Sequence, residues 1–264
     1  MTIANNLFKY LYEIKTYHYS LQQLVRQQLI LRYRRTVFGY LWTLLNPILM
    51  MSVTAVVFSA LFKVDLKTFA IFLFAGMIPW NCFSSMVTQS ATSFISNEGL
   101  IKKIYLPKLL FPLSICFSVL IDSLLSFVAL LIIILVVGGQ VSWALLFIPV
   151  AFILLFLFSF GIALVISVST VFFRDLQYVI GVAMQALFFL SPVLYKSSAL
   201  AGKVAWIVKI NPIAAYIELF RAPLDLATMP DPSIIISATI MGFTSLIIGL
   251  VFFIKQEQKI VFRL

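Results

Sequence analysis

Charged residues are scarce in this sequence. Only 11% of its 264 residues are Asp, Glu, Lys or Arg, whereas 62% are hydrophobic. A water-soluble domain is usually nearer half apolar and a quarter charged, and a soluble chain of this length could not bury so much apolar surface in one core. The composition therefore predicts a protein embedded in lipid. No polar stretch is long enough to fold separately, so residues 1–264 are expected to form one membrane domain.

Histidine and cysteine are also rare, which excludes most site chemistries. The one histidine is His18, and the two cysteines, Cys82 and Cys116, lie in apolar segments. Histidine-based catalysis is therefore not expected, and the cysteines are expected to be small packing residues rather than disulfide or metal ligands. The sequence also lacks the G-x-x-x-x-G-K-[ST] loop that cradles nucleotide phosphates. We expect this chain to be no enzyme and to bind no metal or cofactor itself.

Six apolar segments dominate what is present. A helix crosses the ~30 Å hydrocarbon core of a bilayer with about 20 residues. Helices are the expected spanning elements because each satisfies its own backbone polar groups in lipid. The predicted fold is therefore an all-α membrane protein of six transmembrane helices. The six segments are residues 41–62, 69–94, 109–137, 143–173, 178–195 and 233–254.

The distribution of Lys and Arg orients these helices. Cytoplasmic segments of membrane proteins carry an excess of basic residues, and a formal net charge of +10 fits this rule without a nucleic-acid partner. With both ends in the cytoplasm, residues 1–40, 95–108, 174–177 and 255–264 are inside. These segments hold 13 of the 19 basic residues, namely Lys9, Lys15, Arg26, Arg32, Arg34, Arg35, Lys102, Lys103, Lys108, Arg174, Lys255, Lys259 and Arg263.

The region before the first span has helical periodicity. Apolar residues recur there at spacings of three and four, which predicts an amphipathic helix in residues 1–40 that lies in the inner membrane interface. The alternative is an ordinary helix packed on another element. The apolar stripe consists of Leu7, Leu11, Ile14, His18, Leu21 and Val25.

Polar residues interrupt two of the spans. Residues 81–94 of the second span are rich in Ser, Thr, Asn and Gln, which predicts either a helix interface or a water-filled path. In the third span, Asp122 is the deeply placed ionisable residue. It is interpreted as a carboxylate bonded to a neighbouring helix, because proton relays usually contain several such groups.

The longest outer connection, residues 196–232, is a poor transmembrane span because it contains several prolines and charges. We predict two short helices that dip into the outer leaflet, with a break at Asn211-Pro212. Glu218 and Arg221 are three residues apart, so on a helix they share a face and could pair.

Several strings, in this order along the chain, resemble the membrane subunits of ABC-2 type exporters, closest to the O-antigen and teichoic-acid permeases. The ordered set is more specific than any single string, and it spans most of the chain. The strings are RYRRTVFGYLWTLLNP (32–47), IPWN (78–81), NEGLIKKIYLPK (97–108), FRDL (173–176), SPVLY (191–195) and NP (211–212), followed by Glu218 and Arg221.

The resemblance implies a homodimer that works with two copies of a separate cytoplasmic ATPase, in the bacterial inner membrane. Both termini would be cytoplasmic, with 255–264 as a cytoplasmic tail. ATP and Mg²⁺ would belong to the partner. A loop between spans two and three docks on the ATPase in this family. The residues in that place are Asn97, Leu100, Lys102, Lys103, Tyr105, Pro107 and Lys108.

The expected cargo is a polysaccharide linked to polyprenyl pyrophosphate, such as the O-antigen of lipopolysaccharide. The cluster Arg32, Arg34 and Arg35 would attract its pyrophosphate. Alternatives are teichoic acid, capsule, a small lipid or drug, and, from another class, an ion-coupled secondary transporter. The candidate residues lining a dimer-centred channel, some of which could instead be interface anchors, are Tyr40, Trp42, Asn46, Trp80, Asn81 and Phe83. The candidate outer gate consists of Asn211, Pro212, Glu218 and Arg221.

Overall fold

The chain folds into a bundle of helices without strands in the part that the structure describes. This computed structural model describes residues 10, 12–32, 36–137, 142–196, 202, 206, 208 and 210–264. Among these residues, five helices are long and apolar enough to cross a membrane. The five are α3 (Trp42–Phe62), α4 (Leu66–Ser90), α6 (Leu110–Val137), α7 (Ile148–Phe172) and α11 (Pro232–Arg263).

The helix at the place of the fifth predicted span is shorter. Helix α8 (Leu176–Leu190) is apolar but has 15 residues. At 1.5 Å per residue this is about 22 Å, less than the bilayer core. Its C-cap, Ser191, is extended, and the chain leaves the helix at the string SPVLY. An all-α membrane protein is confirmed, whereas a count of six full spans stays a prediction.

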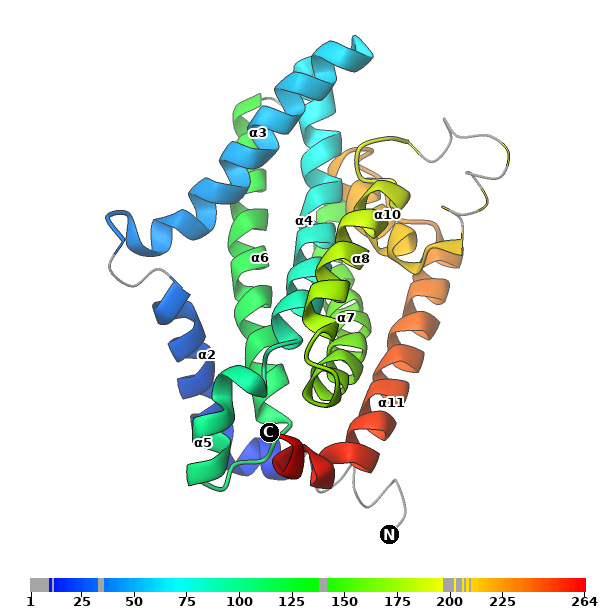
Figure 1. Cartoon of the computed structure of the whole chain (residues 1–264). Coiled ribbons are helices and arrows are strands. Elements are labelled where there is room, and N and C mark those ends of the chain that lie inside the picture. The colour runs from blue at the N-terminus through cyan, green and yellow to red at the C-terminus, as the bar shows by residue number, and fades with distance from the viewer. Residues whose placement is uncertain are drawn as a thin grey trace.

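Helices α3, α4, α6, α7, α8 and α11 run alternately up and down, which brings the C-terminus to the same end of the bundle as the start of α2, which spans His18–Arg32 (Figure 1). Helix α5 (Glu98–Lys103), the start of α2 and the C-terminus lie together there, and we call this the α5 end. The α3–α4 hairpin and α10 (Pro212–Leu224) lie at the opposite, α10 end.

Helices α7 and α11 make the most extensive helix–helix contact in the described part of the bundle. Glycine permits their close approach: a Cβ on Gly161 would collide with the backbone of Ser245, and one on Gly249 would collide with the backbone of Gly161. The Ser245 hydroxyl donates a hydrogen bond of 2.8 Å to the carbonyl oxygen of Phe158 across the crossing. Small residues at a helix crossing are typical of membrane proteins, where packing rather than water exclusion holds helices together.

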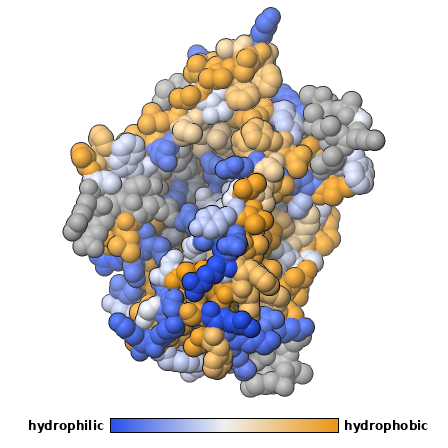
Figure 2. All heavy atoms as spheres, viewed as in Figure 1, coloured by the Kyte–Doolittle hydropathy of each residue, from blue (hydrophilic) through white to orange (hydrophobic). Residues whose placement is uncertain are grey.

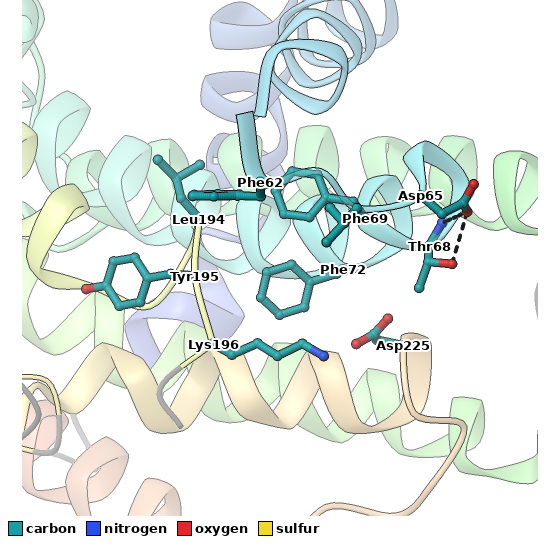
Figure 3. A pocket seen from close by; sticks show the side chains of 10 residues that line it. Phe62, Asp65, Thr68, Phe69, Phe72, Leu194, Tyr195, Lys196 and Asp225 are labelled. Atoms are coloured by element: carbon teal, nitrogen blue, oxygen red, sulfur yellow. Dashed lines mark hydrogen bonds between the residues drawn. The ribbon is translucent and has the colours of Figure 1, made fainter. Parts of the chain in front are cut away.

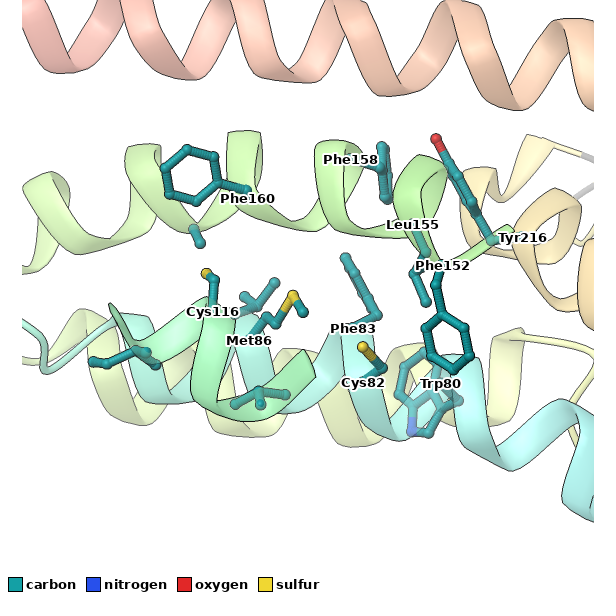
Figure 4. Close-up of a cluster of buried hydrophobic side chains, with 14 of the residues drawn as sticks. Trp80, Cys82, Phe83, Met86, Cys116, Phe152, Leu155, Phe158, Phe160 and Tyr216 are labelled. Atoms are coloured by element: carbon teal, nitrogen blue, oxygen red, sulfur yellow. The ribbon is translucent and has the colours of Figure 1, made fainter. Parts of the chain in front are cut away.

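A column of aromatic rings connects α4, α7 and α10 through the core (Figure 4). Phe83 of α4 stacks on Phe158 of α7 at 5.7 Å between centroids, and Phe158 stacks on Tyr216 of α10 at 4.8 Å. The Tyr216 hydroxyl then donates to the carbonyl oxygen of Ala238 in α11, 2.8 Å away. This column of rings ties α10 to the spanning helices and so fixes the α10 end of the molecule.

The small polar and sulfur-containing residues of α4 and α6 pack together in the same core. Cys82 and Cys116 are free and fully buried, as predicted for packing residues. Ser90 lies 3.6 Å from the sulfur of Cys116, so part of the polar half of α4 forms a helix interface. Partly buried Asp122 lies on α6.

The N-terminal helix packs against the bundle. Helix α2 contacts α6, and its Leu24 and Val25 are buried while Gln22, Gln23 and Arg26 are exposed. The helix is amphipathic, and Val25 is on the buried side as the sequence predicts, but His18 of the predicted stripe is exposed. At the other terminus, α11 continues without interruption through residues 255–263, so the predicted tail is about the last two and a half turns of a helix.

Candidate functional site

The loop at the α5 end presents a short helix to the surroundings. A 3₁₀ turn (Ile95–Asn97) leads into α5, and the Asn97 amide donates a hydrogen bond of 2.8 Å to the Ser93 carbonyl oxygen. Lys102 pairs with Glu98 at 2.6 Å, and this hydrogen bond holds the pKa of the Glu98 carboxyl below its ordinary value. Leu100 is half-buried and Lys103 is exposed.

After α5 the chain is extended, and its side chains differ in exposure and in hydrogen bonding. Tyr105 is 78% exposed, whereas Pro107 is buried. The Lys108 ammonium donates a hydrogen bond of 2.9 Å to the backbone carbonyl oxygen of Glu257 in α11. The Glu257 carboxylate in turn accepts a hydrogen bond from the Tyr10 hydroxyl. Lys108 is therefore engaged within the chain, while Lys102, Lys103 and Tyr105 remain on the surface.

The predicted headgroup cluster falls largely outside the described residues. Arg32 is the last residue of α2, but its side chain, and the whole of Arg34 and Arg35, are not described. Their proposed role stays a prediction.

The predicted channel residues occupy three different environments. Trp80 and Phe83 are buried in the core of this single chain, where Trp80 packs on Phe188 with 5.5 Å between centroids. This placement favours packing for the two rings. Trp42 is half-buried against Phe38, at 5.5 Å and 85° between rings. The remaining members are Asn46, which is exposed, Asn81, which is half-buried, and Tyr40, whose side chain is not described.

A polar stripe on α4 is better placed to face a path than the two buried rings. Asn81, Ser85 and Thr88 are all half-buried and recur at spacings of four and three, which puts them on one side of the helix. Figure 2 shows a hydrophilic band that runs up the middle of one face, between α3 and α8, from a larger hydrophilic region at the α5 end.

At the α10 end, Asn211 joins α10 to the end of α8. Its side-chain oxygen accepts a hydrogen bond of 3.1 Å from the Ile213 backbone and caps α10, with Pro212 at the first helical position. Its side-chain nitrogen donates to the Ser191 hydroxyl at 2.8 Å and to the Leu190 carbonyl oxygen at 3.3 Å. The sequence predicts the break at Pro212, and α10 begins there. The first of the two predicted short helices lies mostly outside the described residues.

Arg221 is the most unusual side chain of this end because it is a buried cation. It is only 4% exposed. Its Nη2 donates a hydrogen bond of 2.6 Å to the Val193 carbonyl oxygen, and its Cζ lies 3.8 Å from the centroid of the Phe72 ring. Gly76 makes room for it, since a Cβ there would be 2.8 Å from Nη2.

The guanidinium remains charged in this position. Burial lowers the pKa of Arg221 to about 10, and the carboxylates of Glu218 and Asp225 oppose that effect. Its hydrogen bond and ring contact go to Val193 and Phe72, across the fold, while Glu218 acts on Arg221 through its charge. Glu218 and Arg221 both line a cavity of about 870 Å³ between α10, α11 and the chain after α8.

Sequence reasoning missed most partners of these side chains. Val193 lies in SPVLY, one of the strings that resemble the exporter family. Nothing in the sequence indicates that Phe72 and Gly76 surround Arg221, or that Glu257 is the partner of Lys108. Each of these pairs is far apart in the sequence and brought together by the fold.

A second cavity, of about 530 Å³, adjoins the first. Both are lined by Phe72, Lys196 and Asp225. Figure 3 shows Lys196 and Asp225 beneath the Phe72 ring, with Asp65 and Thr68 at the far side. Burial raises the pKa of Asp225, whereas the cations Lys196 and Arg221 lower it. Within the described residues, no group of His, Cys, Asp or Glu is arranged to hold a metal ion.

Comparison with known proteins identifies similar chains. A family model described as ABC-2 type transporter matches residues 19–224. The chain is 33% identical over 241 residues to the O-antigen export system permease protein RfbA of Klebsiella pneumoniae. The matched residues cover 89% of this chain and 91% of the relative. The protein of that name from Myxococcus xanthus is 28% identical over 221 residues, 83% and 85% of the two chains. The polysialic acid transport protein KpsM of Escherichia coli is 24% identical over 252 residues, 91% and 96%. The family match includes the α5 loop and ends with the last residue of α10.

Proposed function

The chain belongs to the ABC-2 type transporter family of membrane proteins, and from this premise we propose that it is the permease of an ATP-driven polysaccharide exporter. The cargo is an O-antigen-type glycan linked to polyprenyl pyrophosphate. The observation that carries the proposal is the likeness to O-antigen export permeases along nearly the whole of both chains.

Two copies of the chain assemble with two copies of a separate ATPase in the inner membrane, with the α5 end in the cytoplasm. The surplus of Lys and Arg at this end supports that orientation. ATP hydrolysis takes place in the partner, because this sequence contains no phosphate-binding loop.

The exposed part of the α5 loop is the docking element for the ATPase. Lys102, Lys103 and Tyr105 are its accessible side chains, and the two lysines suit an acidic surface. Lys108 has a different role, because its hydrogen bond to Glu257 fixes the loop to α11. A movement of α5 caused by the ATPase is then transmitted to the bundle, because the loop cannot bend independently of α11.

The glycan follows a path bordered by the polar stripe of α4. Small hydroxyl and amide groups suit such a path because they offer many weak hydrogen bonds and no deep binding site, so a long chain can slide. Arg32, Arg34 and Arg35 attract the pyrophosphate where the lipid enters.

At the outer side, Asn211, Pro212, Glu218 and Arg221 gate the exit. Support comes from two hydrogen bonds that hold α10 to the chain after α8. One joins Asn211 to Ser191 and the other joins Arg221 to Val193, and we call them clasps. Opening would require both clasps to break while the ring column through Tyr216 keeps α10 attached to the bundle.

A capsule-type acidic glycan is a second candidate cargo. It is supported by the more distant likeness to a polysialic acid transport protein. The composition of glycan that accumulates inside cells lacking the chain would distinguish the two cargoes.

The proposal is tested by purifying the tagged chain from its host in mild detergent. We expect a stoichiometric P-loop ATPase, two copies of each chain by mass, and ATP hydrolysis in the purified fraction. An oligomer of this chain alone, with transport that proceeds without ATP, would contradict the proposal and would favour an ion-coupled transporter in which Asp122 is the next residue to replace.

A further inference from the structure

A groove of about 370 Å³ lies between α2 and α6, and the proposed export path does not use it. The two helices contact each other, and Figure 1 shows α2 beside the part of α6 nearer the α5 end. Leu21, Val25 and Leu29 recur every four residues on α2, so they form one ridge of that helix. Phe117 and Ile121 of α6, also four residues apart, form the opposite wall. The walls of the groove are therefore apolar.

The rest of the chain covers these apolar side chains only in part. Val25 is buried, whereas Leu21, Leu29, Phe117 and Ile121 are half-buried. The volume of the groove lies within the range of pockets that hold a small molecule. In a membrane, the hydrocarbon chain of a lipid is the group that completes the packing of such a surface.

The groove lies at the depth of one leaflet. Helix α6 begins at Leu110 at the α5 end, and at 1.5 Å per residue Phe117 and Ile121 lie about 10 to 17 Å further along the helix. The headgroup region and half of the hydrocarbon core together measure about 20 Å. With the α5 end in the cytoplasm, as proposed above, the groove faces the inner leaflet.

Two polar side chains border this apolar groove. Gln22 and Arg26 both line it, are exposed, and lie four residues apart, so they form a second ridge of α2 beside the apolar one. Arg26 forms no ion pair within the described residues, and no acidic side chain among them lines the groove, Asp122 included. A cation at this depth is costly without an anion beside it. The phosphates of lipid headgroups are the anions available there.

We propose that the groove binds one anionic phospholipid of the inner leaflet, such as phosphatidylglycerol. The lipid phosphate accepts hydrogen bonds from the Arg26 guanidinium and the Gln22 amide, and one acyl chain lies between the apolar ridge of α2 and the wall of α6. A lipid with net negative charge is favoured because nothing in the groove balances Arg26. The bound lipid holds α2 against α6 and so positions the helix that precedes α3. This site rests on the proposed orientation, but it is independent of the cargo.

The test is native mass spectrometry of the complete exporter, purified in mild detergent. The probe is an equimolar mixture of phosphatidylglycerol and phosphatidylcholine with the same acyl chains. We expect the wild-type chain to retain phosphatidylglycerol about fivefold more than phosphatidylcholine, which is the effect of one basic side chain near a membrane surface. Arg26→Gln should lose this preference. Arg174→Gln, the control, should keep it, because Arg174 is exposed at the α5 end and does not line the groove. Equal retention of the two lipids by the wild type, or an unchanged preference in Arg26→Gln, would overturn the site.

A second pair of variants tests the place of the acyl chain. Ile121→Trp puts a larger side chain into the groove, whereas Val128→Trp puts the same side chain at an exposed position two turns further along α6, outside the groove. We expect the first variant to release phosphatidylglycerol and the second to retain it as the wild type does. An Ile121→Trp protein that elutes as folded in size-exclusion chromatography and still retains the lipid would contradict the placement.

A competition experiment separates a phospholipid from the lipid of the cargo. Undecaprenyl phosphate is added to the wild-type exporter at the same concentration as phosphatidylglycerol. We expect phosphatidylglycerol to remain bound, and its displacement would overturn the proposal, because the groove would then hold a prenyl chain. A chain that purifies without an ATPase would refute the proposed function but still permit the lipid measurement, so the two failures are distinguishable.

Discussion

Arg221 is a charged side chain held inside the protein by a backbone carbonyl and an aromatic ring. Such a group is costly to bury unless each of its partners is in place. Because the partners come from α4 and from the chain after α8, the arginine joins three segments at the α10 end. Its loss should therefore affect both stability and closure.

Arg221→Met is expected to lower the free energy of unfolding by about 1–3 kcal/mol, because the buried Val193 carbonyl loses its donor. The thermal midpoint of the purified permease measures this, with Lys196→Met as the control, since that lysine is exposed. A midpoint equal to that of the wild type would contradict the role of Arg221 as a clasp.

Two lysines of the α5 loop should fail in different ways. Lys108→Met removes a hydrogen bond to Glu257 and is expected to lower the free energy of unfolding by about 1 kcal/mol. Lys103→Glu should leave the thermal midpoint unchanged but reduce the amount of ATPase that co-purifies, because it reverses an exposed charge. If both variants behaved alike in both measurements, the division between anchoring and docking would be wrong.

Among the helices, the α7–α11 crossing is the contact least tolerant of change. Gly249→Leu places a side chain against the backbone of Gly161, which cannot move aside. Overpacking of this kind should cost about 3 kcal/mol. Gly181→Ala in α8 is the control, since no atom beyond its own stretch of helix lies within 4 Å of the added Cβ. Folded yield in size-exclusion chromatography checks both, and wild-type yield for Gly249→Leu would show that the helices separate more easily than the structure indicates.

The polar stripe of α4 predicts a pattern of water access. In a background in which the buried Cys82 and Cys116 are alanine, cysteines at Ser85 and Thr88 should react with a membrane-impermeant thiol reagent during ATP turnover. A cysteine at the buried Phe83 should remain unreactive. Labelling at Phe83 but not at Ser85 and Thr88 would indicate that the water-filled path lies on the other side of the helix.

The sequence predicts the elements well because lipid imposes a simple rule of length and hydrophobicity. Helices α3, α6 and α7 match the predicted spans closely, and α10 begins at the predicted proline. The prediction is less accurate for α8 and α11. Helix α8 ends at Leu190 because the chain turns to meet Asn211 and Arg221, and α11 continues past the apolar segment because Tyr10 and Lys108 hold its last turns.

At the scale of the whole molecule, the sequence predicts which segments are functional, but it does not predict which side chains contact one another. The α5 loop and the α10 region are recognisable as strings, yet the sequence cannot separate Lys108 from Lys103 or place Arg221 against Phe72. Those distinctions depend on contacts between residues distant in sequence. Trp80 and Phe83 are aromatic, as expected for residues that line a sugar path, but they are buried in the core.

The central claim is that this chain carries a lipid-linked polysaccharide out of the cytoplasm. The most direct test depletes the chain in its host and measures the glycan inside and outside the cell. We predict that surface polysaccharide falls while the lipid-linked glycan accumulates at the inner face of the membrane, and that re-expression of the wild-type chain reverses both. Unchanged surface polysaccharide with no accumulation inside would contradict the claim.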